Sequence, residues 1–116
     1  MLAPLRRTGD LTPARLDNGV TRASPGFAAA YRAIAEGGWV GMTAKPEHGG
    51  MGLPVTLLTC VNEMMASANM ALSLCPLLSQ GQIEALSAHA DPSLKAIYLP
   101  RLVAGRSLPC GLAGAG

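Results

Sequence analysis

The sequence predicts an all-α protein, an orthogonal or up-down bundle of about five helices. First, the 116 residues include 19 Ala and 17 Leu but only 5 Val and 3 Ile, and Ala and Leu favour helices whereas β-branched residues favour strands. Second, apolar residues recur at helical spacing along most of the chain. Third, many of the 14 Gly and 9 Pro fall between these periodic segments, where such residues end helices.

The first helix is expected after an irregular N-terminal arm. Residues 1–23 show no sustained period and are predicted to be that arm. Ser24 and Pro25 then suit the cap and the first position of a helix, which ends at Gly37. The Gly- and Pro-rich stretch 39–53 is predicted to be a loop.

A second helix is expected from Pro54, with a break at residues 67–69. Polar residues lie largely off its apolar stripe. That stripe consists of Leu57, Leu58, Val61, Met64, Met65 and Ala68.

The remaining helices are predicted over residues 70–78 and 80–90, and from Asp91–Pro92 onward. The segment 70–78 is apolar nearly all round, so it should be central and buried, and Pro76 should kink or end it. In the next helix, Ile83 and Leu86 should face inward. The last helix is capped by Asp91 and Pro92, and its predicted inner face consists of Leu94, Ile97, Tyr98 and Leu102. Residues 24–106 would then form one helical domain, followed by an aperiodic tail at 107–116.

Composition excludes several functional classes. The net charge is only +2, and no basic stripe with interleaved aromatic residues exists for binding nucleic acid. Polar residues and Pro76 interrupt the longest weakly polar stretch, 64–78, so no membrane span is predicted. No apolar segment follows Arg6 and Arg7 as a secretory signal would require. Three cysteines fit a reducing compartment, and we expect a soluble cytoplasmic protein.

The loop at residues 47–52, Glu-His-Gly-Gly-Met-Gly, has the glycine content of a phosphate-binding loop. No Lys-Ser or Lys-Thr pair follows it, and no predicted strand precedes it. The pattern therefore favours a structural loop.

The reactive side chains show no catalytic or metal-binding pattern. The two histidines, His48 and His89, lie in different segments without a metal-ligand spacing. Glu63 is on the polar side of its helix and has no evident partner. The cysteines lack a Cys-x-x-Cys spacing, and two of them lie in apolar stretches that favour an inert core role; the three are Cys60, Cys75 and Cys110. No catalytic residue, cofactor ligand or metal ligand is predicted.

Met70, Leu74 and Leu78 are spaced i, i+4 and i+8 and therefore share one face of a helix. The periodicity alone favours a place in the core. The alternative is that this face lines an apolar ligand cavity, a role suited to the flexible Met side chain.

Four motifs together resemble the N-terminal helical domain of acyl-CoA dehydrogenases. Residues 38–42 read Gly-Trp-Val-Gly-Met, and residues 46–54 read Pro-Glu-His-Gly-Gly-Met-Gly-Leu-Pro. A helix with Asn-Glu at positions 62 and 63 follows. Residues 95–105 then read Lys-Ala-Ile-Tyr-Leu-Pro-Arg-Leu-Val-Ala-Gly. The resemblance covers about residues 25–106 in the family's order and spacing, and the run 67–76 is most similar to the subgroup that includes methylmercaptopropionyl-CoA dehydrogenases.

The resemblance implies one domain of a larger flavoprotein. Members of the family oxidise acyl-CoA to 2,3-enoyl-CoA with FAD, form homo-oligomers, and carry the catalytic glutamate in a C-terminal helical domain. FAD lies mainly between the middle and C-terminal domains. Residues 107–116 do not match the family's flavin-contacting motif, so we expect a truncated domain that is inactive and binds no FAD by itself.

The resemblance also bears on the apolar face. It matches residues 70–78 to the helix that reaches the acyl pocket, which would make Met70, Leu74 and Leu78 part of the pocket wall. A different hypothesis is a stand-alone helical module without catalysis, which presents its apolar face to a protein partner.

Overall fold

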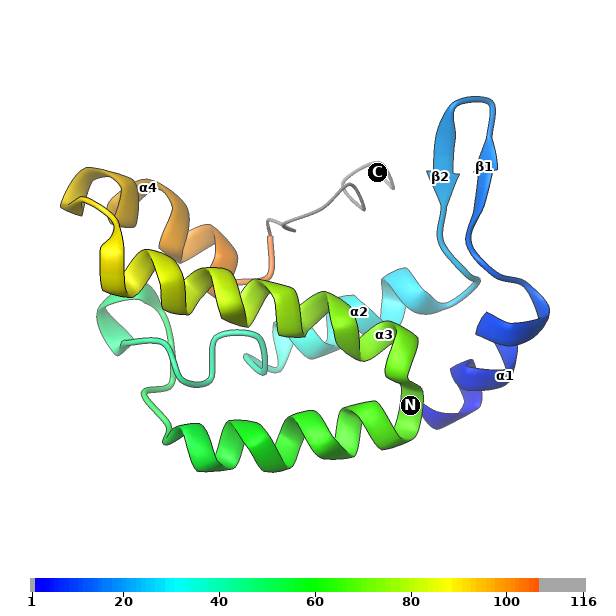
Figure 1. Cartoon of the computed structure of the whole chain (residues 1–116), viewed down its shortest axis with the longest axis horizontal. Coiled ribbons are helices and arrows are strands. Elements are labelled where there is room, and N and C mark those ends of the chain that lie inside the picture. Colours follow the sequence, from blue (N-terminus) through cyan, green and yellow to red (C-terminus); the bar gives the residue numbers. More distant parts are fainter. Residues whose placement is uncertain (1, 107–116) are drawn as a thin grey trace.

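The arrangement of elements is mostly helical, as predicted (Figure 1). The computed structural model describes residues 2–106. In this part of the chain four α-helices, one short 3-10 helix and one small β-hairpin follow in order: α1 (Ala3–Leu11), β1 (Arg15–Asp17), β2 (Val20–Arg22), α2 (Phe27–Glu36), η1 (Pro46–His48), α3 (Val55–His89) and α4 (Pro92–Val103). The predicted tail at 107–116 lies outside the described residues.

The prediction of an irregular arm at residues 1–23 was wrong. Helix α1 carries a proline in its first turn, where the missing N–H costs no helical hydrogen bond. Strands β1 and β2 pair antiparallel around Asn18 and Gly19, whose φ angles of 49° and 79° suit a type I′ turn. The Asn-Gly pair is a strong hairpin signal, but the composition and lack of period of residues 1–23 did not reveal it.

Helix α2 begins later than predicted. Its N-cap is Gly26, which has a φ of 84°, rather than Ser24. The Ser24 carbonyl oxygen instead accepts a hydrogen bond from the Phe27 N–H at 3.1 Å. Leu5 of α1 lies against Gly26, where a Cβ would come within 2.7 Å of the Leu5 Cδ2 atom. The glycine therefore provides both the left-handed conformation and the close approach.

Helix α3 consists of two segments joined at a sharp corner. Asn69 has non-helical angles (φ −161°, ψ 93°), which confirms the break predicted at residues 67–69. The segments 55–68 and 70–89 run back along each other in Figure 1. Pro76 was predicted to kink or end the second segment, and it does not end it: the helix continues to His89. Within residues 2–106, no helix has the length and apolarity required to cross a membrane.

The core lies between α2, the loop after it, the second segment of α3, and α4. Its side chains include Ile34, Val40, Leu72, Ile83 and Leu99, and Ile83 faces inward as predicted. The predicted inner face of α4 was largely wrong. Leu102 is buried, together with Leu99 and Val103, whereas Leu94, Ile97 and Tyr98 are exposed. The periodicity of α4 defined an apolar face but did not show which of its residues are buried in the core.

Candidate functional site: an apolar helix face beside a hollow

Asn69 sets the direction of the second segment of α3. Its side-chain Oδ1 accepts a hydrogen bond from the Leu72 N–H at 3.1 Å, which is the geometry of a helix N-cap. The residue is only 2% exposed, and its Nδ2 atom is buried without a hydrogen-bond partner in the described structure. The break was predicted from the sequence but the cap was not, although an Asn just before an apolar helical run is a recognised start signal.

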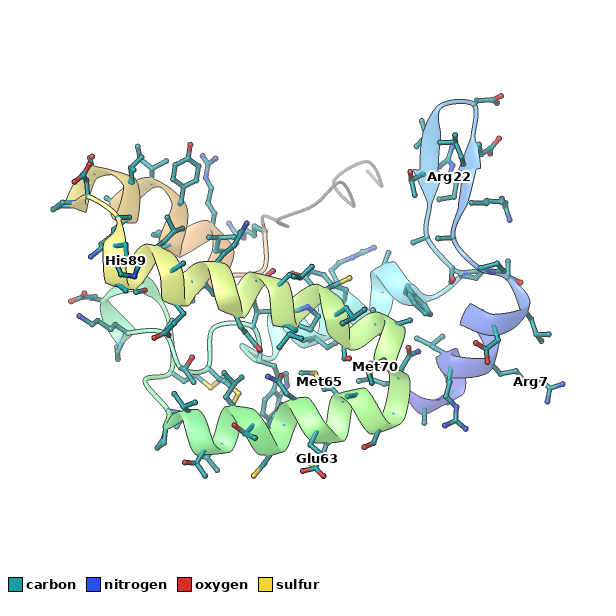
Figure 2. All side chains as sticks on the ribbon, viewed as in Figure 1. Arg7, Arg22, Glu63, Met65, Met70 and His89 are labelled. Carbon is teal, nitrogen blue, oxygen red and sulfur yellow. The ribbon has the colours of Figure 1, made fainter. Side chains whose placement is uncertain are left out.

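The segment that follows divides cleanly into an inner and an outer face. The inner face is buried and comprises Leu72, Ser73, Pro76, Ser79, Gln80 and Ile83. Met70, Leu74 and Leu78 lie on the outer face and are 62%, 47% and 49% exposed, and Figure 2 marks Met70 just beyond the corner. These three side chains are therefore not core residues within the described part of the chain. They form a continuous apolar line on its surface.

Two of these three residues line a hollow of about 830 Å³ between the corner and α1. Met70 and Leu74 form part of its wall, together with Asn69. Phe27 contributes an aromatic side chain from the start of α2, and α1 contributes Arg6 and Asp10. Leu78 is not among the lining residues and lies farther along the same face. An apolar wall with charged groups from one neighbouring element suits an amphipathic ligand.

A polar bridge holds the two segments of α3 in register. The Asn62 Nδ2 donates to the Gln80 Oε1 at 3.0 Å, and the Gln80 Nε2 donates to the Trp39 carbonyl oxygen at 3.4 Å. Gln80 is buried, so these hydrogen bonds satisfy its amide inside the protein. The bridge fixes the rotation of the second segment of α3 about its axis. It therefore also fixes the direction in which the outer face of that segment points.

The backbone N–H groups of the Gly-rich loop donate hydrogen bonds to nearby backbone carbonyl oxygens. The N–H groups of residues 49–53 donate to Pro46, Lys45, Gly41, Ala44 and Met42 carbonyl oxygens respectively, at 2.8–3.3 Å. A phosphate-binding loop needs such groups free to point at the ligand. The structure thus supports the structural-loop interpretation of residues 47–52.

The titratable side chains do not converge on one site. His48 lies 3.4 Å from Glu47 (Nε2 to Oε1), and His89 is in the last turn of α3. Figure 2 shows Glu63 pointing away from the second segment of α3. No three His, Cys, Asp or Glu side chains among residues 2–106 are grouped as metal ligands.

The cysteines differ in their surroundings. Cys60 is exposed, contrary to the core role predicted for it, because it lies outside the buried stripe of α3. Cys75 is partly buried and lines the hollow. Cys110 lies outside the described residues.

Comparison with known proteins agrees with this architecture. Residues 13–106 match the family described as acyl-CoA dehydrogenase, N-terminal domain. The chain is also 42% identical over 106 residues to the 3-methylmercaptopropionyl-CoA dehydrogenase of Ruegeria pomeroyi, an alignment that covers 91% of this chain and 18% of that enzyme. The chain therefore spans less than a fifth of the length of this relative. Because the family match extends over most of its residues, the chain belongs to the acyl-CoA dehydrogenase family and corresponds to its N-terminal helical domain.

Proposed function

We propose that this domain forms one wall of the acyl-CoA pocket of an FAD-dependent acyl-CoA dehydrogenase and is inactive alone. The observation that carries the proposal is the outer face of Met70, Leu74 and Leu78, which is apolar yet exposed. A large apolar surface on one side of a helix costs free energy in water unless a ligand or another part of the protein covers it. In the proposed enzyme, the acyl chain and the remaining domains cover it.

The hollow beside this face supports the same proposal. Its lining along α3 is mostly apolar, which suits an acyl chain, whereas Arg6 and Asp10 supply charge from α1. We assign this domain a binding surface and no general base. General base catalysis requires a positioned group, which another domain supplies in the proposed enzyme.

We infer further that the Gly-rich loop does not hold FAD. A flavin pyrophosphate needs free backbone N–H groups or cationic side chains arranged around it. The Gly-rich loop donates the N–H groups of residues 49–53 internally, so it offers no such cradle. No catalytic step is therefore assigned through the flavin, and we expect the isolated chain to leave the fluorescence of added FAD unchanged. Saturable quenching at one FAD per chain would contradict this expectation.

A chimeric enzyme tests the pocket wall. In it, residues 13–106 replace the matching segment of the Ruegeria pomeroyi enzyme, and kcat/KM is measured for acyl-CoAs of increasing chain length. Leu74→Phe should lower kcat/KM selectively for the longer substrates, because a filled apolar slot rejects extra methylenes at about 1–3 kcal/mol each. Leu57→Phe is the matched control, since Leu57 is equally exposed at 47% but precedes the corner.

The outcomes separate three roles. A selective loss with Leu74→Phe and none with Leu57→Phe supports the pocket wall. Parallel losses for all substrates with a lowered Tm would place Leu74 in a packed interface, because overpacking destabilises a protein irrespective of substrate. Unchanged profiles in both variants would remove Leu74 from both the pocket wall and any packed interface.

A further inference from the structure

The β-hairpin leaves one self-complementary strand edge without a partner. Within residues 2–106, strands β1 and β2 pair only with each other. Every residue in them is exposed, and the hairpin projects away from the helical body in Figure 1. An isolated two-stranded hairpin is marginally stable in water. From the sequence of its outer edge, we propose that β1 pairs with β1 of a second copy of this chain, an interface independent of the proposed enzymatic role.

Backbone geometry assigns Leu16 to the centre of this interface. The register pairs Asp17 with Val20 next to the two-residue turn, and Leu16 with Thr21. In such a hairpin the pair beside the turn is hydrogen-bonded, and hydrogen-bonded and non-hydrogen-bonded pairs then alternate. The N–H and C=O of Leu16 therefore point away from β2. Across a two-fold axis, Leu16 of each copy can exchange both hydrogen bonds with Leu16 of the other.

Charge complementarity selects a second copy as the occupant. Antiparallel pairing about Leu16 places Arg15 opposite Asp17 of the other copy, and Asp17 opposite its Arg15. These are non-hydrogen-bonded positions, where facing side chains are closest. The β2 edge, Val20–Arg22, has no such self-complementarity, because Arg22 would face Val20.

The second copy also relieves an unfavourable pair within the hairpin. Arg15 lies directly opposite Arg22, and like charges at facing positions destabilise a sheet. Arg22 has Asp17 at 3.9 Å, whereas Arg15 makes no ion pair with the residues that the structure describes. In the dimer, each Arg15 gains the Asp17 of the other copy. On the opposite face of the sheet, Leu16, 74% exposed here, packs against Leu16 of the other copy.

Charge reversal tests the proposal in the 116-residue chain by sedimentation velocity over a concentration series. Arg15→Asp or Asp17→Arg alone should each raise the dimer dissociation constant at least about tenfold, because two facing pairs become repulsive. The double variant Arg15→Asp/Asp17→Arg should dimerise like the unmodified chain. A mixture of the two single variants should form heterodimers, since their edges are complementary.

Arg32→Asp is the matched control because it changes the net charge as much as Arg15→Asp but is an exposed residue of α2 rather than of the hairpin. It should change the dissociation constant by no more than about twofold. Hydrogen exchange gives a local measurement: the Leu16 amide should become protected as the dimer forms, whereas the Thr21 amide should not. A monomer at every concentration, association unaffected by Arg15→Asp, or single variants that fail to pair in the mixture would each overturn the proposal.

Discussion

The Asn62 side-chain amide donates a hydrogen bond to the Gln80 Oε1 atom at 3.0 Å, across 18 residues of sequence. Because α3 turns back at Asn69, this contact links its two segments side by side. Gln80 extends the link to the loop through the Trp39 carbonyl. The buried Gln80 amide thus connects both segments of α3 and the loop that follows α2.

Removing this link should destabilise the domain measurably. Asn62→Ala leaves the Gln80 Oε1 unpaired and should lower the free energy of unfolding by about 1–2 kcal/mol. A double-mutant cycle with Gln80→Ala, followed by urea denaturation, should give a coupling energy of about 1 kcal/mol. Glu63→Ala, at an exposed neighbour, should stay within about 0.5 kcal/mol of the parent. Additive effects of the two amide variants would show that the bond contributes nothing.

The corner at Asn69 should depend on its side-chain oxygen. Asn69→Ala removes the acceptor for the Leu72 N–H and should cost about 1 kcal/mol of stability. Asn69→Ser keeps an acceptor and removes the buried, unpartnered Nδ2, so it should cost less. Chemical denaturation of the three proteins gives the order directly. Equal losses in both variants would mean that the cap contributes little.

Two glycines should respond in opposite directions to alanine. A Cβ at Gly50 would collide with the Ala44 carbonyl oxygen, so Gly50→Ala should distort the loop and lower stability by more than about 1 kcal/mol. Gly81 lies within α3, and a Cβ added there would meet no atom within 4 Å. Gly81→Ala should therefore stabilise the helix by about 0.5–1 kcal/mol. Thermal unfolding should show one Tm falling and the other rising.

Stability should decline in alkaline solution through Tyr31. Burial raises the pKa of its hydroxyl, and a charge on Cys75 adds to the rise, although the Ser79 hydroxyl beside it offsets part of the shift. The folded state thus holds the phenolic proton more tightly than the unfolded state does. The resulting stability is present below the ordinary pKa of about 10 and is lost as the pH rises through the folded value.

Tyr31→Phe should reduce this alkaline loss. Denaturation midpoints measured between about pH 8 and pH 11 should fall less steeply for Tyr31→Phe than for the parent. Tyr98→Phe, at an exposed residue, serves as the control and should retain the parental slope. Identical slopes in all three proteins would assign the alkaline decline to other groups.

Local sequence signals explain which parts of the fold were predictable. Pro54 and Asp91 are the N-caps of α3 and α4, and Pro92 is the first residue of α4, as expected, because caps and first-turn prolines act over a few residues. The break near Asn69 was predictable for the same reason. Pro76 does not end the helix because it removes only a local hydrogen bond. The packing of Leu72 and Ile83, on either side of it, keeps the helix continuous.

Which apolar face is buried was less predictable. Met70, Leu74 and Leu78 have the same periodicity as core residues, and spacing defines a face without saying what covers it. Leu94, Ile97 and Tyr98 show the same ambiguity on α4. The hollow beside the corner also depends on α1, whose position relative to α3 is a tertiary property that the local pattern does not contain.

The corner at Asn69 also limits how the length of this domain can change. One residue inserted after Asn69 would rotate the whole returning helix by about 100° relative to the core. Leu72 and Ile83 would then leave the interior, and polar or exposed side chains would take their places. Insertions and deletions should therefore be excluded at this position, whereas the helical core should tolerate them at the exposed Asn18–Gly19 turn, which lies outside that core.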